Sequence, residues 1–121
     1  MRSVDIAVIC ALHTPELEKL RETNGCDWKM VQADPGDPTT YYSTVFTTEG
    51  GTNLHVLAAA PNHMGPTSTA VLTAKMIWRF RPKLVAMVGI AAGARSNDQN
   101  YGDILAADTT YAHDCRSEWP C

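Results

Sequence analysis

The sequence has no excess of positive charge, few aromatic residues and no long hydrophobic run. Ten lysines and arginines stand against 13 aspartates and glutamates among 121 residues, so the formal net charge is −3. Because domains that bind nucleic acid usually carry an excess of basic residues, we expect no nucleic acid partner. The longest apolar run is far too short to cross a bilayer, and we therefore expect no membrane association.

The cysteines lack the spacing of a metal site or a redox motif. None of Cys10, Cys26, Cys115 and Cys121 forms a Cys-x-x-Cys pair, so we expect no metal and no cofactor. The first residues also lack the apolar core of a signal peptide, which indicates a cytoplasmic protein with free thiols. In an oxidising compartment, Cys115 and Cys121 could instead pair.

What the chain does contain is an alternation of strand-like and helix-like segments. The apolar pattern predicts strands at Val4–Cys10, Tyr41–Thr48, Leu54–Ala60, Leu84–Ile90 and Asp103–Ala107, with helices from Thr14 to Asn24-Gly25 and over Thr67–Phe80. This order predicts an α/β fold: a layered mixed sheet with a parallel centre, flanked by helices. Since neither a repeat nor a linker interrupts the chain, we expect residues 1–121 to form a single domain.

The two helices have distinct start and packing signals. Thr14 is a candidate N-cap, Pro15 suits the first helical position, and Glu16 falls in the first turn, where the helix dipole favours an acid. In the second helix, apolar residues recur at helical spacing and predict the packed side: Ala70, Val71, Ala74, Ile77 and Trp78.

Three segments leave the ends of apolar strands and carry the candidate site residues. The run Leu84–Gly93 ends in small residues, which is typical of a place where a ligand or another backbone comes close. In α/β folds, ligands bind at the carboxyl ends of strands, so we expect the three exits to converge. The other two exits are Ala11–Glu16 and Ala60–Gly65. They bring a carboxylate, two imidazoles and a thioether: Glu16, His13, His63 and Met64.

Several motifs in the expected order carry a resemblance to a known family. They are Val4–Leu12 followed by Glu-Leu, Met64-Gly65 before an Ala-containing helix, Arg81-Pro82-Lys83-Leu84 with Gly89-Ile90-Ala91-Ala92-Gly93, Gly102-Asp103-Ile104-Leu105, and His113-Asp114. In these motifs the chain resembles the N-terminal half of the nucleoside phosphorylase/nucleosidase superfamily. The methylthioadenosine/S-adenosylhomocysteine nucleosidase-like branch is the most similar.

The resemblance implies hydrolysis of the N-glycosidic bond of a purine nucleoside or nucleotide. It makes Glu16 the carboxylate that orients the attacking water. It also implies a substrate-binding surface around the ribose and the base, formed by Met64, Gly65, Ile90, Ala91, Ala92 and Gly93. From the residues alone, Glu16 could equally be an acid that stabilises a helix start, and the small-residue run could be a close-packed strand end.

The resemblance also implies that part of the catalytic machinery lies elsewhere. The family's domain is about twice this length, and its purine-protonating aspartate and its Met-Glu ribose element belong to the second half. We therefore expect a nucleosidase-like domain that is incomplete at its C-terminal side. An uncovered sheet edge would then favour a homo-oligomer or a fused or separate partner chain.

Two other functions stay open at this point. The chain could be a catalytically inactive nucleoside-binding or assembly module, or part of a phosphorylase that uses phosphate. Phosphorylases of the superfamily bring arginines to the phosphate early in the chain, but the segment between Cys10 and Leu20 contains no arginine. Water is therefore the expected nucleophile.

Overall fold

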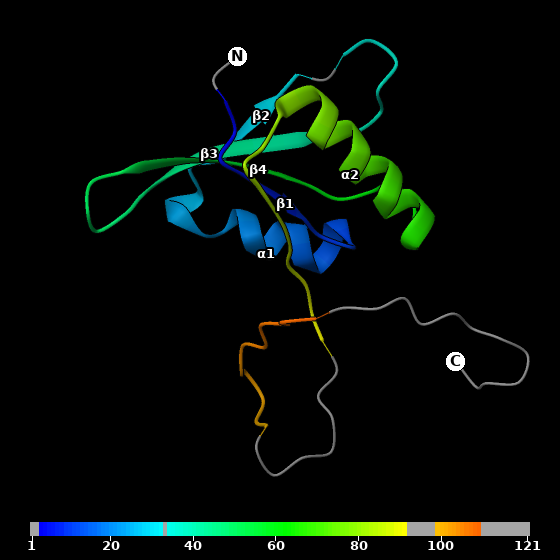
Figure 1. Cartoon of the computed structure of the whole chain (residues 1–121). Helices are drawn as coiled ribbons and strands as arrows, with labels where there is room; N and C mark the ends of the chain where they lie inside the picture. The colour runs from blue at the N-terminus through cyan, green and yellow to red at the C-terminus, as the bar shows by residue number, and fades with distance from the viewer. Residues whose placement is uncertain (1–2, 33, 92–98, 110–121) are drawn as a thin grey trace, which may run out of the picture. The chain divides into compact units, whose positions relative to one another are not determined.

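The computed structural model describes residues 3–32, 34–91 and 99–109. Contacts divide the chain after Ile90 into two units, and each unit is described by itself. All the helices and strands of the described residues belong to the first unit (Figure 1). No helix in these ranges is long and apolar enough to cross a membrane.

The first unit is built on a five-stranded mixed sheet in the order β2-β3-β4-β1-β5. The strands are β1 (Ile6–Ile9), β2 (Lys29–Val31), β3 (Tyr41–Thr47), β4 (Asn53–Ala59) and β5 (Leu84–Met87). Strand β1 pairs in parallel with both β4 and β5, whereas β3 is antiparallel to β4 and to β2. The α/β class with a parallel centre is therefore confirmed. Strand β2 was not predicted, because three residues are too few to show an apolar alternation.

Helical segments lie on both faces of this sheet (Figure 1). They are η1 (His13–Leu17), α1 (Glu18–Arg21), η2 (Asn24–Cys26) and α2 (Pro66–Phe80). Because side chains alternate across a strand, β1 contributes to two cores. Ala7 and Ile9 pack in the core beneath α2, while Val8 packs with Leu17 on the opposite face.

The buried side of α2 differs from the predicted one. Leu72, Met76 and Phe80 are at most 4% exposed and face the sheet. By contrast, Ile77 and Trp78 are 46% and 76% exposed, so the predicted packing side is wrong. Helix α2 carries two apolar stripes at helical spacing, and the sheet covers the one with Leu, Met and Phe.

A polar cluster around Asp37 links the loop before β3 to helix α2. The Asp37 carboxylate accepts hydrogen bonds from the Thr39 N–H at 3.0 Å and the Tyr41 hydroxyl at 2.8 Å, and it pairs with the Lys75 ammonium at 3.1 Å. Burial opposes ionisation of Asp37, but these donors outweigh it and hold the pKa of Asp37 below its usual value. Burial and the bond to Asp37 together raise the pKa of Tyr41 to about 12.

The predicted strand Asp103–Ala107 is not formed. Residues 103–107 have no regular secondary structure, and the Ile104 side chain is 95% exposed. A strand needs a hydrogen-bonded neighbour, and no strand of the described residues pairs with this segment. Instead, Asp103 closes a turn: its carboxylate accepts the Asn100 N–H at 2.8 Å.

Candidate active site

The carboxyl ends of three adjacent strands lie side by side along one border of the sheet, its carboxyl edge. Strands β4, β1 and β5 are parallel, and Ile9 is opposite Ala59 on one side and Met87 on the other. The Cys10 N–H continues the ladder to the Ala59 carbonyl at 3.0 Å, and the Val88 N–H continues it to the Ile9 carbonyl at 3.0 Å. The three predicted strand exits therefore leave the sheet at the same edge.

The Glu16 carboxylate joins two of these strand ends. Its Oε2 accepts hydrogen bonds from the Ala11 N–H at 2.8 Å and the Leu12 N–H at 3.2 Å, both just after β1. Its Oε1 accepts the Ile90 N–H at 3.2 Å, just after β5 and 74 residues away in the chain. A half-buried side chain is thus held by three backbone donors.

The wide turn η1 explains how Glu16 reaches this position. It is closed by a hydrogen bond from the Leu17 N–H to the Leu12 carbonyl at 3.1 Å, a spacing of five residues that often marks functional sites. Leu17 is only 2% exposed and anchors the turn to the core. The prediction that Thr14 is the N-cap is wrong, because Leu12 occupies that position. The Thr14 hydroxyl instead donates to the Glu18 carboxylate at 2.8 Å.

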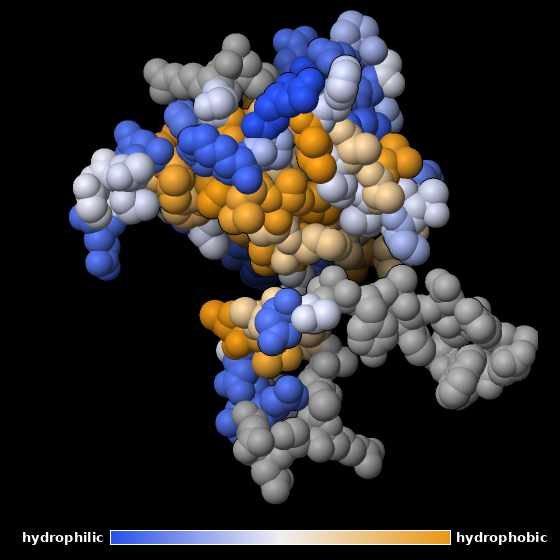
Figure 2. Space-filling view, viewed as in Figure 1, coloured by the Kyte–Doolittle hydropathy of each residue, from blue (hydrophilic) through white to orange (hydrophobic). Residues whose placement is uncertain are grey.

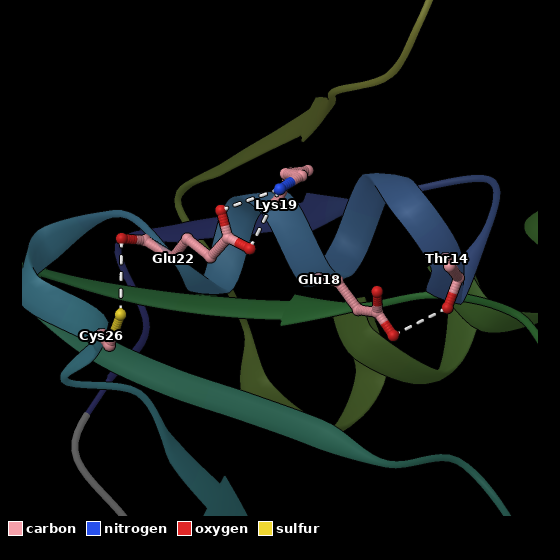
Figure 3. A network of polar contacts seen from close by, with 5 residues as sticks. All are labelled: Thr14, Glu18, Lys19, Glu22 and Cys26. Atoms are coloured by element: carbon pink, nitrogen blue, oxygen red, sulfur yellow. Dashed lines mark hydrogen bonds and ion pairs between the residues drawn. The ribbon is translucent and has the colours of Figure 1, made fainter.

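The outer side of η1 and α1 carries a row of polar contacts (Figure 3). Beyond the Thr14–Glu18 bond, Lys19 pairs with Glu22 at 3.1 Å, and the Cys26 thiol donates to the Glu22 carbonyl at 3.6 Å. Exposed pairs of this kind contribute little to stability. The burial of Leu17 and the backbone contacts of Glu16 are therefore what position this segment.

Comparisons with known proteins place this chain in a family. A family profile described as the phosphorylase superfamily matches residues 5–120. The chain belongs to the phosphorylase superfamily. The chain is also 40% identical over 107 residues to the uncharacterized protein y4jS of Sinorhizobium fredii (strain NBRC 101917 / NGR234). That match covers 88% of the chain but only 25% of the relative, and no solved structure matched.

The other site residues predicted for this superfamily member are only partly described. Met64 and Gly65 follow β4 at the same sheet edge, and the Met64 side chain is 74% exposed. Ile90 is 75% exposed while its N–H binds Glu16. Ala91 begins the second unit, so its place relative to Glu16 is not assigned, and Ala92 and Gly93 lie outside the described residues.

The two histidines expected near the strand exits are both exposed. His13 belongs to η1 on the β1 side of the edge. His63 follows β4 and lines a surface pocket with Asn62, Thr67, Ser68 and Lys75. Among the residues that the structure describes, no group of three or more His, Cys, Asp or Glu side chains is arranged to hold a metal.

Cys10 lies next to the carboxylate but is not a nucleophile candidate. It is fully buried, and burial together with the nearby Glu16 charge raises the pKa of its thiol to about 11. The reactive form of cysteine is the thiolate, which such a pKa suppresses at neutral pH. Between these two neighbouring groups, Glu16 rather than Cys10 is therefore the one suited to accept a proton from a nucleophile.

Sequence reasoning found the carboxylate but missed what holds it. The donors at Ala11, Leu12 and Ile90 are backbone groups, so no side-chain motif indicates them. The available signal was indirect, because parallel pairing of two apolar strands places the N–H groups after them at the same edge.

Proposed function

We propose that this chain supplies the nucleophile side of a purine nucleosidase-type reaction, with Glu16 as the group that orients and deprotonates water. The water oxygen forms a bond to C1′ of the ribose while the N-glycosidic bond breaks. Glu16 takes a proton from the water, and the purine leaves with the electron pair and receives a proton from the aspartate that the resemblance assigns to the second half of the family's domain. The substrate class is a purine nucleoside or nucleotide.

The fixed position of the Glu16 carboxylate is the observation that carries this proposal. An ionised carboxylate offers about four acceptor positions on its two oxygens. Two N–H groups engage Oε2, but the Ile90 N–H alone among the described donors engages Oε1. Oε1 therefore has an acceptor position left that can bind a water molecule, and its orientation is set before the water arrives.

The same geometry favours water over phosphate as the nucleophile. A phosphate at this edge would need donors, and three backbone N–H groups there are already bound to a carboxylate. A phosphate anion close to Glu16 would also meet a like charge.

The test is release of purine from methylthioadenosine, S-adenosylhomocysteine, AMP and ATP, each with and without phosphate. Phosphate-independent release that Glu16→Gln lowers by roughly 10²–10⁴-fold is the expected result. Glu18→Gln is the matched control, because that carboxylate binds the Thr14 hydroxyl on the outer side of the turn. Release that requires phosphate would favour the phosphorylase alternative instead. Equal release by both variants would remove Glu16 from the mechanism.

A second candidate, an assembly module, is favoured by the edge strand β5. Among the described residues, β5 pairs only with β1, and Leu84, Met87 and Val88 are 57%, 68% and 48% exposed. Figure 2 shows apolar surface exposed on the visible face of this unit. Exposed apolar surface of this kind favours association. A folded chain that releases no purine but forms a stable oligomer or partner complex in sedimentation experiments would favour this candidate.

A further inference from the structure

Gly89 is set apart from most of the described glycines by its backbone and its surroundings. Gly25, Gly36, Gly51, Gly65 and Gly102 have positive φ angles and open space where a Cβ would stand. Gly89 has an ordinary φ, so its backbone conformation is open to any residue. Its missing side chain must therefore be explained by what lies beside it.

What lies beside Gly89 is the Glu16 carboxylate. A Cβ built on Gly89 would stand 3.0 Å from Oε1 of Glu16, and 3.3 Å from both Cδ and Oε2. These separations are shorter than ordinary van der Waals contact for a Cβ atom, which begins at 3.4 Å. A methyl group at position 89 and the carboxylate in its present place cannot both be accommodated without a shift.

We propose that Gly89 is a positioning residue for Glu16, an inference that rests on the proposed function for its catalytic meaning. The glycine leaves room for Oε1 to reach the Ile90 N–H, the contact that ties the carboxylate to the end of β5. Oε2 is held separately by Ala11 and Leu12. The absence of a side chain at position 89 thus fixes the direction of Oε1, the oxygen with an acceptor position left for water.

Alanine at position 89 displaces a side-chain end rather than the backbone. The three nearest atoms that the methyl group would meet belong to the flexible end of Glu16. Gly89→Ala is therefore expected to fold, with the carboxylate pushed away from Ile90. Gly50→Ala is the matched control, because Gly50 also lacks a positive φ and its Cβ would meet only Thr48 Oγ1, at 3.9 Å.

The experiment compares backbone amide chemical shifts of the ¹⁵N-labelled chain. In the wild-type background, Glu16→Gln should shift the amide signals of Ala11, Leu12 and Ile90 together. In the Gly89→Ala background, the same change should still shift Ala11 and Leu12 but leave Ile90 in place. The comparison within one background cancels the direct effect of the new methyl group on its neighbour. In the Gly50→Ala background, all three signals should shift as in the wild type.

An Ile90 response to Glu16→Gln that persists in the Gly89→Ala background would overturn the inference. If Gly89→Ala proves less stable than Gly50→Ala, its cost should be smaller when measured in a Glu16→Ala background, because that background lacks the atoms that the methyl group meets. An equal cost of Gly89→Ala in both backgrounds would show that something other than Glu16 requires the space, and would overturn the inference as well.

Measuring purine release separately tests this inference and the proposed function. Where purine release is observed, Gly89→Ala should lower kcat several-fold with KM nearly unchanged, because the carboxylate must move by a few tenths of an ångström and a misplacement of about 1 Å can cost about a hundredfold. If no purine is released by the wild-type chain, either alone or together with a chain that supplies the purine-protonating acid, the proposed function fails, while the amide comparison still decides whether Gly89 positions Glu16. If kcat is unchanged although the Ile90 contact is lost, the positioning role is refuted.

Discussion

The hydrogen bonds of Glu16 predict a specific loss of stability for Glu16→Gln. The glutamine oxygen can take the place of Oε2 and accept the Ala11 and Leu12 N–H groups. Its NH₂ group would then face the Ile90 N–H, so that two donors meet where a donor and an acceptor met before. One charge-assisted bond is lost and two others become neutral.

The size of the effect follows from the character of these bonds. A hydrogen bond to a charged group contributes about 1.5–3 kcal/mol, against about 0.5–1.5 kcal/mol for a neutral one. Because Glu16 is half-buried, water can partly replace the lost contact. We therefore expect a loss of about 2 kcal/mol in the free energy of unfolding, or roughly 8–16 °C in Tm for a unit of this size.

Urea unfolding at pH 7, followed by circular dichroism, measures this loss. Glu18→Gln provides the reference, because its exposed carboxylate accepts a hydroxyl on the outer side of the turn. That variant should lose no more than about 0.5 kcal/mol. Similar small losses in both variants would refute the reasoning, since the three N–H groups would then bind water as well as they bind Glu16.

Three further predictions concern the core, the thiols and the Asp37 cluster. Met76→Ala should cost about 2–5 kcal/mol in urea unfolding, but Ile77→Ala on the exposed stripe less than about 1 kcal/mol; equal costs would contradict the observed packing of α2. Cys26, which is exposed, should react with a disulfide reagent at pH 8 while the buried Cys10 stays protected. The raised pKa of Cys10 also predicts that the free energy of unfolding declines as pH rises from about 9 toward 11, because the unfolded chain loses the thiol proton first. Asp37→Asn should cost about 1–3 kcal/mol at pH 7; because the pKa of Asp37 is lowered, the difference from wild type should shrink as the solution is acidified through that pKa, and a constant difference would exclude this linkage.

The parts of the fold that the sequence predicts are those with a strong local pattern. The apolar runs in β1 and β4 are continuous because these central strands are buried on both faces of the sheet. Helix α2 was predicted to within one residue, with Pro66 at its start and Pro82 just beyond its end. In each case a short-range physical cause leaves a mark in the residues themselves.

The parts that could not be predicted depend on partners distant in the chain. Helix α2 offers two apolar stripes, and only the neighbouring sheet determines that Met76 rather than Ile77 is buried. The sequence of Asp103–Ala107 satisfies a strand pattern, but a strand forms only when another strand is there to pair with it. Local patterning indicates what a segment can become, whereas tertiary contacts select the outcome.

Glu16 makes both a local contact and a contact with a residue distant in the chain. Its two interpretations, as an acid that stabilises a helix start and as the water-orienting carboxylate, are therefore not exclusive. Its bond to the Leu12 N–H, at the N-terminal boundary of η1, is the local contact that an acid near a helix start makes. Its bond to the Ile90 N–H links the ends of β1 and β5, and stabilising a helix start does not require that bond. The glycine that precedes Ile90 leaves the space for this second contact. A carboxylate that only capped a turn would not contact Ile90, so an Ile90 response to Glu16→Gln that is present in the wild type and absent in the Gly89→Ala background distinguishes a helix-start acid from one that also joins the ends of β1 and β5.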